Sequence, residues 1–185
     1  FTYPEIGNTG INFEDSESNN NIVKGIIVRN FSNNTSNWRS KLSLDQWLKK
    51  NNVIGLFGID TRALVKILRN NGSMNGIITT EDISIKTCCK YLDETPSMSG
   101  LNLASKVSTT KEYFWTHSES NFSFGTLMSN PKKEKLKVVA IDFGIKKSIL
   151  KRLSYYGCDV IVLPSNSSID KVLSHEPNGI FFSNG

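Results

Sequence analysis

The chain has 185 residues, enough for one good hydrophobic core or two modest ones, and its 38% hydrophobic and 21% charged residues are typical of a soluble globular protein. The net charge is +5, but the lysines are spread along the sequence without a dense basic run, which favours a solvated surface over a nucleic-acid site. No apolar stretch approaches the roughly 20 residues that cross a bilayer, and no signal-peptide pattern opens the chain, so no membrane association is expected.

The first part of the chain, from Phe1 to about Tyr113, is predicted to be a compact α+β unit whose own beginning is missing. Ser43 with Gln46 three residues later is a capping box, which predicts the start of a helix. Asp60 or Thr61 is expected to cap a second helix; a charged site there is the alternative, and the cap is favoured. Strands are expected at Ile22–Arg29, Val53–Gly58 and Ile77–Ile78.

Two stretches carry apolar residues at helical spacing, and the first of them ends at Asn71 and Gly72. The second stretch includes two adjacent cysteines, which we interpret as small apolar members of a helix face. The two faces consist of Ala63, Leu64, Ile67 and Leu68, and of Ile85, Cys88, Cys89 and Leu92.

The cysteines and histidines carry no pattern of a reactive site. The third cysteine, Cys158, begins a predicted buried strand, and three cysteines with two of them adjacent make no disulfide framework. His117 falls in a polar linker and His175 near a helix end, so no Cys-His pair and no metal site is expected.

Residues 117–135 are rich in Ser, Asn and Lys with little periodicity, which is typical of a surface link between domains. We place the boundary near Pro131. Residues 1–130 then form an N-terminal domain with its linker, and residues 131–185 form the start of a second, truncated domain.

The second domain opens with one strand, one tight turn and one helix in immediate succession. The continuous apolar run Val138–Ile141 suits a central strand of a parallel sheet, covered on both faces. Residues 142–144 break the run, and apolar residues at helical spacing follow until Gly157, which predicts the helix end. In open α/β sheets ligands bind at the carboxyl edge, where this turn lies.

The same unit then repeats, with strands predicted at Asp159–Leu163 and Ile180–Phe182 and a short helix between them. A β-α-β-α-β series predicts a parallel sheet with the ends of its first and third strands at one edge. Asp142 and Gly185 should therefore face one cleft. Asp142-Phe143-Gly144 also matches the metal-binding tripeptide of protein kinases, but a kinase needs a catalytic loop and a Gly-rich strand pair that the chain lacks, so chance similarity is favoured.

Several longer motifs resemble, in order and over the whole chain, the small subunit of carbamoyl-phosphate synthase. They are FTYPEIGNTGIN at the start, SNWRS at 36–40, GIDTRALVKILRNNGSMNGIIT at 58–79, PSMSGLNLASKVST at 96–109, IDFGIKKSILKRL at 141–153 and GIFFSNG at 179–185. One departure stands at Ser148, where the family usually has Asn; it puts a local contact at the helix start in doubt.

The resemblance implies a small-subunit N-terminal domain followed by the first β-α-β-α-β of a class I glutamine amidotransferase doubly wound sheet. In that mechanism a cysteine thiolate attacks the glutamine carboxamide, a His carries the proton, and ammonia passes to a large subunit that combines it with bicarbonate and ATP, for arginine and pyrimidine biosynthesis. The Gly that ends SNG begins the glutamine-binding loop, which makes Gly185 the glutamine-binding residue of this chain. The nucleophile, its His and the Glu behind it lie beyond Gly185, so no catalytic residue is expected here.

No cofactor or metal is expected in this chain, because ATP and magnesium belong to the large subunit. Trp38 and Arg39 are candidate contacts with that partner; a buried Trp and a solvent-facing Arg are the alternative. The chain alone is expected to hydrolyse no glutamine.

Two other classes of function stay open: a non-catalytic flavodoxin-like module that uses Asp142 for phosphate or metal, and a structural subunit that only docks a partner. Richness in Asn, Lys and Ile suits an AT-rich genome, and the family has plastid-encoded members, so a plastid (chloroplast) location is preferred, with the cytoplasm as the alternative.

Overall fold

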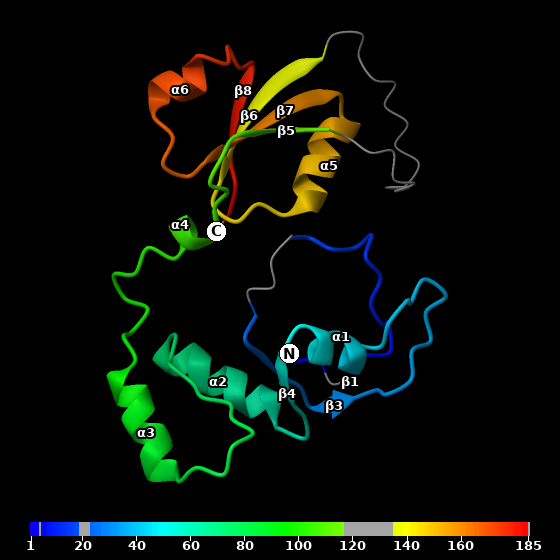
Figure 1. The fold of residues 1–185 in the computed structure, drawn as a ribbon, viewed down its shortest axis with the longest axis vertical. Helices are drawn as coiled ribbons and strands as arrows, with labels where there is room; N and C mark the ends of the chain where they lie inside the picture. Colours follow the sequence, from blue (N-terminus) through cyan, green and yellow to red (C-terminus); the bar gives the residue numbers. More distant parts are fainter. Residues whose placement is uncertain (4, 19–22, 117–134, 185) are drawn as a thin grey trace. The chain divides into compact units, whose positions relative to one another are not determined.

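The computed structural model describes residues 1–3, 5–18, 23–116 and 135–184, and it divides into two compact units, Phe1–Leu101 and Asn102–Gly185 (Figure 1). Together they form a mixed α/β structure with small sheets. Among the described residues, no helix is long and apolar enough to cross a membrane.

The first unit is built from two small parallel strand pairs and three helices. Strand β1 pairs with β3 and β2 pairs with β4, while the buried core consists of Ile26, Val28, Leu48 and Val53. The elements are β1 (Glu5–Ile6), β2 (Gly25–Ile27), β3 (Asn30–Phe31), α1 (Leu44–Lys50), β4 (Ile54–Leu56), α2 (Thr61–Asn71) and α3 (Ile85–Glu94).

The predicted helix starts of this unit are confirmed. At the start of α1 the Ser43 hydroxyl accepts the Gln46 backbone N–H while the Gln46 side chain accepts the Ser43 N–H. Asp60 caps α2 by accepting the Ala63 N–H at 3.0 Å, so the cap and not a charged site explains this acidic residue. Gly72, with φ of +80°, ends α2 as predicted.

Three strand predictions in this unit differ from the structure. The strand predicted at Val53–Gly58 is shorter, since β4 covers Ile54–Leu56. The strand predicted at Ile77–Ile78 is wrong, because these residues pair with no strand; the Ile78 side chain instead lies against Gly25 of β2. The predicted strand Ile22–Arg29 is shorter in the structure, where β2 covers Gly25–Ile27 and Ile22 lies outside the described residues. A β-branched pair alone does not make a strand when no partner backbone lies beside it.

Helix α3 confirms the predicted helix around the adjacent cysteines. Cys88 is half-buried and Cys89 exposed, and both carry free thiols, as does Cys158. The described chain buries no residue of α3 and only Thr61 of α2.

The second unit contains a four-stranded sheet in the order β5-β7-β6-β8. Strand β6 pairs in parallel with β7 on one side and β8 on the other, which confirms it as a central strand of the predicted parallel arrangement. The elements are α4 (Ala104–Val107), β5 (Tyr113–Trp115), β6 (Leu136–Asp142), α5 (Lys147–Tyr155), β7 (Cys158–Pro164), α6 (Ile169–Leu173) and β8 (Gly179–Phe182).

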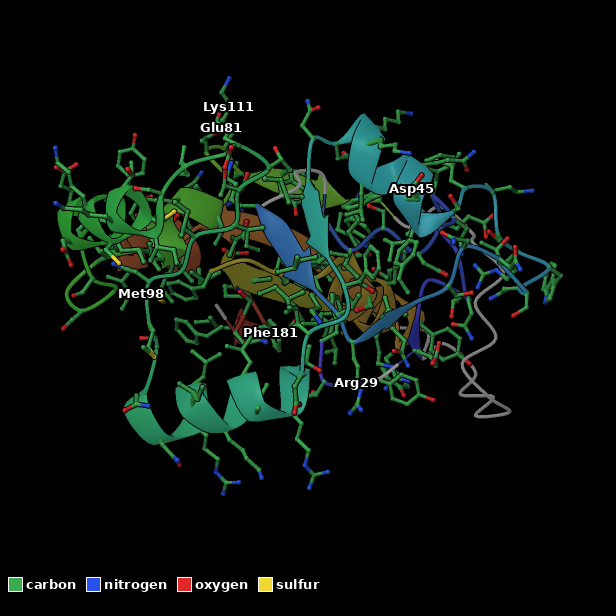
Figure 2. The ribbon with its side chains drawn as sticks, turned by 90° about the horizontal axis from the view of Figure 1, so that it is seen from below. Arg29, Asp45, Glu81, Met98, Lys111 and Phe181 are labelled. Atoms are coloured by element: carbon green, nitrogen blue, oxygen red, sulfur yellow. The ribbon has the colours of Figure 1, made fainter. Side chains whose placement is uncertain are left out.

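The two faces of this sheet are covered by different helices. Alternate residues of β6 and β7 point to opposite faces, as the pleat requires. On one face Leu150 of α5 packs with Ala140, Val160 and Val162, and on the other Val172 of α6 packs with Val139, Ile141, Ile161 and Leu163. Phe181 of β8, which is labelled in Figure 2, also packs against the cluster on the α5 side. The prediction of a strand covered on both faces is confirmed for β6.

Strand β5 explains why the compact units divide earlier than the boundary placed near Pro131. It pairs antiparallel with β7, from Tyr113↔Val162 to Trp115↔Val160, and so belongs to the second sheet. The compact units therefore divide between Leu101 and Asn102. Residues 117–134, which contain the proposed boundary, lie outside the described residues.

Candidate functional site

The candidate site lies at the carboxyl edge of the sheet, where β6 and β8 end side by side. The register pairs Ile141 with Phe182, so that Asp142 and Ser183 follow at neighbouring strand ends. The edge predicted to hold Asp142 near the end of the third strand is therefore confirmed as far as Ser183, while Gly185 lies outside the described residues.

Asp142 is buried, with 6% of its surface exposed, and its carboxylate is occupied by backbone N–H groups. Oδ1 accepts the N–H groups of Gly144 and Ile145, each at 2.8 Å, and Oδ2 accepts the Thr109 N–H at 2.7 Å. Hydrogen bonds to an ionised carboxylate are stronger than those to neutral acceptors. Asp142 thus fastens the turn that follows β6 to the segment that precedes β5.

Gly144 allows the segment that precedes β5 to pass close to the turn that follows β6. Its φ is +111°, a region that favours glycine, and a Cβ built there would lie 3.1 Å from Cγ2 of Val107. A side chain at this position would meet both backbone strain and a crowded neighbour.

Ser183 is the second buried residue that holds backbone in place at this edge, and it too is 6% exposed. Its hydroxyl oxygen accepts the Phe143 N–H at 2.8 Å, and its own N–H donates to the Ile141 carbonyl at 3.1 Å. The chain that leaves β8 is therefore held through both its backbone and a side chain against β6 and the turn.

The segment before β5 makes two further contacts with this unit. The Ser108 hydroxyl accepts the Ser165 N–H at 2.9 Å. Glu112 accepts from Lys171 Nζ at 2.9 Å and lies 3.2 Å from His175 Nε2. The Lys171 hydrogen bond is the main reason why the pKa of the Glu112 carboxyl lies below its ordinary value, and His175 adds to the effect.

The hydrogen bonds give Asp142 a structural role at this edge. Three of its acceptor positions already hold N–H groups of its own chain. Across the described ranges, no three His, Cys, Asp or Glu residues gather in a way that could hold a metal ion. In the flavodoxin-like alternative, phosphate or metal would have to displace these N–H groups from Asp142.

Cys158, the cysteine of this unit, is not placed for nucleophilic work at this edge. Cys158 begins β7, at the edge opposite to the candidate site, and burial, with the neighbouring Asp159, raises the pKa of its thiol. His175 lies beside Glu112. Cys158 packs against the hydrophobic cluster on the α5 side, whereas Cys89 is exposed on α3.

The exposure of Trp38 and Arg39 does not match the alternative of a buried Trp and a solvent-facing Arg. Trp38 is 90% exposed, whereas Arg39 is half-buried and pairs with Glu14 at 3.1 Å and Asp15 at 3.0 Å. A buried Trp with a solvent-facing Arg is thus wrong for this structure. Trp is one of the residue types enriched among the anchor residues of protein interfaces.

Sequence reasoning missed the contribution of residues 107–112 and the part played by Ser183. The Asp142 turn carried a local signal, because Asp accepts backbone N–H groups two and three residues ahead in turns. No local pattern in the sequence indicated the Thr109 and Ser183 contacts, since they join residues 33 and 40 positions apart.

Comparison with known proteins connects this architecture to one family. A family model described as the carbamoyl-phosphate synthase small chain, CPSase domain, matches residues 1–78. Proteins named carbamoyl phosphate synthase small chain from Synechocystis sp., Pyropia yezoensis and Porphyra purpurea are 47%, 43% and 42% identical to this chain.

Each of these alignments covers 100% of this chain and 48% of the relative. The chain thus spans about half the length of the curated relatives it matches, and the similarity runs through both compact units. Along its whole length this chain is therefore similar to proteins named carbamoyl phosphate synthase small chain.

Proposed function

We propose that this chain is part of the subunit that hydrolyses glutamine and delivers ammonia for carbamoyl phosphate synthesis by a large subunit. The observation that carries the proposal is the 42–47% identity to proteins named carbamoyl phosphate synthase small chain along the entire sequence. Synthesis from glutamine would serve arginine and pyrimidine biosynthesis.

The second unit is proposed to begin a class I glutamine amidotransferase sheet, and residues up to the linker to form the small-subunit N-terminal domain. The strand order β7-β6-β8, with α5 and α6 on opposite faces, supports this interpretation. In such a sheet the carboxyl edge receives the substrate, and the Asp142 and Ser183 fastenings lie at that edge.

Within that mechanism Gly185 is proposed to begin the loop that holds glutamine and donates a backbone N–H to the tetrahedral oxyanion. A residue without a side chain lets the backbone approach the ligand closely. The cysteine nucleophile, its His and its Glu are proposed to lie outside this chain, so the chain supplies positioning and no catalytic residue. ATP and magnesium are proposed to act on the large subunit.

The partner is proposed to be the carbamoyl-phosphate synthase large subunit, with Trp38 among the residues that contact it. The exposed indole supports this assignment, and the Arg39 pairs with Glu14 and Asp15 hold the adjacent backbone. The red algal relatives support a plastid location, with the cytoplasm as the alternative.

Two measurements test the proposal. Purified chain incubated with glutamine should release no glutamate above a control without protein, and release above that control would show that a nucleophile lies within these 185 residues. In the full-length subunit bound to its large partner, Gly185→Ala should lower glutamine-dependent synthesis by up to about 10² to 10³, because the added Cβ displaces a backbone N–H that is proposed as an oxyanion donor. Ammonia-dependent synthesis should persist, because external ammonia bypasses the glutamine site; loss of both would contradict the proposal.

A further inference from the structure

Two buried side chains at the carboxyl edge accept hydrogen bonds from backbone N–H groups. Ser183 and Asp142 are each 6% exposed, and each accepts N–H groups from residues that are distant in sequence. A buried hydroxyl or carboxylate that is fully engaged in this way fixes the backbone around it.

We propose that Ser183 is a positioning residue for the glutamine-holding loop, and that Asp142 acts on the same loop through the turn that carries Phe143. This inference rests on the proposed function, in which the loop begins at Gly185. Neither side chain is proposed to touch glutamine.

Ser183 is held in place two residues before the loop begins, so its position limits where the loop can start. One residue, Asn184, separates Ser183 from Gly185, and two extended residues span at most about 7 Å. The Phe143 N–H holds the Ser183 hydroxyl and the Ile141 carbonyl holds its backbone N–H, so a shift of either contact should move the start of the loop. Oxyanion donors act only over a narrow range of distance, so a displacement of about 1 Å is costly to catalysis.

Asp142 helps to position the donor of the hydrogen bond between Phe143 and Ser183. The donor to Ser183 is the N–H of Phe143, the first residue of the turn whose next two N–H groups bind Asp142 Oδ1. The Thr109 N–H on Oδ2 holds the carboxylate itself in place. A change at Asp142 should therefore loosen the Phe143 donor without removing the Ser183 hydroxyl.

The test is Ser183→Ala in the full-length small subunit bound to its large subunit. Loss of one hydrogen bond of ordinary strength should lower glutamine-dependent kcat per folded subunit by on the order of tenfold. The loss should appear in kcat more than in KM, because the loop donor acts in the transition state. Ser183→Thr, which keeps the hydroxyl, should restore most of the rate.

Ser168→Ala is the matched control, since the Ser168 hydroxyl also accepts one backbone N–H, that of Lys171 at the start of α6. It should lower the melting temperature while it leaves glutamine-dependent kcat within about twofold of wild type. Both variants are assayed at a temperature at which circular dichroism shows them folded. Ser183→Ala kinetics equal to those of Ser168→Ala would overturn the inference.

If Ser183→Ala does not fold, Asp142→Asn provides the second test, and a wild-type glutamine-dependent kcat in that variant would overturn the inference. A wild-type complex that uses ammonia but not glutamine would overturn the proposed function itself. Wild-type use of glutamine together with an unaffected Ser183→Ala variant would overturn only the positioning role.

Discussion

Asp142→Asn should destabilise the second unit through one identifiable contact. The asparagine side chain is nearly the same size as aspartate, but one of its two terminal atoms is an NH₂ donor. If that donor faced Gly144 and Ile145, two N–H groups would lose their acceptor, so the lower-energy orientation turns it toward Thr109. The variant should therefore lose the Thr109 contact and hold the turn that carries Phe143 more loosely, because a neutral amide oxygen is a weaker acceptor than a carboxylate.

The size of the effect follows from the charge of the acceptor. Hydrogen bonds to charged groups contribute about 1.5 to 3 kcal/mol, so we expect a loss of about 2 kcal/mol. For a unit of this size, 1 kcal/mol shifts the melting temperature by roughly 4 to 8 °C, which gives a fall of roughly 10 °C. Thermal unfolding of the whole chain, together with hydrogen exchange of the Thr109 amide, measures both the energy and its location.

Asp159→Asn is the matched control for this carboxylate-to-amide change. Asp159 pairs with Lys135 at 3.1 Å, but its side chain is 61% exposed, and exposed pairs contribute about 0 to 1 kcal/mol. If Asp142→Asn were no more destabilising than Asp159→Asn, or if the Thr109 amide kept its protection, the carboxylate would not be the fastening described above.

Three further outcomes are expected. Leu150→Ala should cost about 2 to 5 kcal/mol in denaturant unfolding because this side chain is 1% exposed in the core of the second unit; a cost below about 1 kcal/mol would contradict that packing. Glu112→Gln should lower the melting temperature at neutral pH, because the Lys171 contact depresses the folded-state pKa of Glu112 below its ordinary 4.5. The stabilisation by ionised Glu112 is lost as pH falls through that lowered pKa, so the difference from wild type should vanish on acidification; parallel pH profiles of the two proteins would refute this. Trp38→Ala should leave the melting temperature unchanged, because the indole is 90% exposed, yet weaken binding to the large subunit in a pull-down or by calorimetry; unchanged affinity would remove Trp38 from the interface.

The parts of the fold that sequence predicted are those whose cause is local. The strand β6, the glycine stop at Gly157 and the capping box at Ser43 each follow from residues within one turn or one run of the chain. Burial of β6 on both faces could also be predicted, because a continuous apolar run has no polar face to offer to solvent. These features need no knowledge of the partner elements.

The parts that sequence did not predict depend on pairing partners far along the chain. Strand β5 is three residues long, and Phe114 in its middle is 67% exposed, so no alternation marks it; its pairing with Val160–Val162 of β7 makes it a strand. Ile77–Ile78 shows the opposite case, a β-branched pair without a partner strand. In the candidate site, the Asp142 turn was visible in the sequence, whereas its link to Thr109 required the folded chain.

The most direct test of the proposed function follows the nitrogen atom. The full-length small subunit that contains this chain, bound to its large subunit, is supplied with glutamine labelled with ¹⁵N in the amide, together with bicarbonate, ATP and unlabelled ammonia at a concentration that supports slow synthesis on its own. We predict that the carbamoyl phosphate carries the ¹⁵N label, and that Gly185→Ala removes the label. Unlabelled product from the wild-type complex would contradict a role for this chain in supplying ammonia from glutamine.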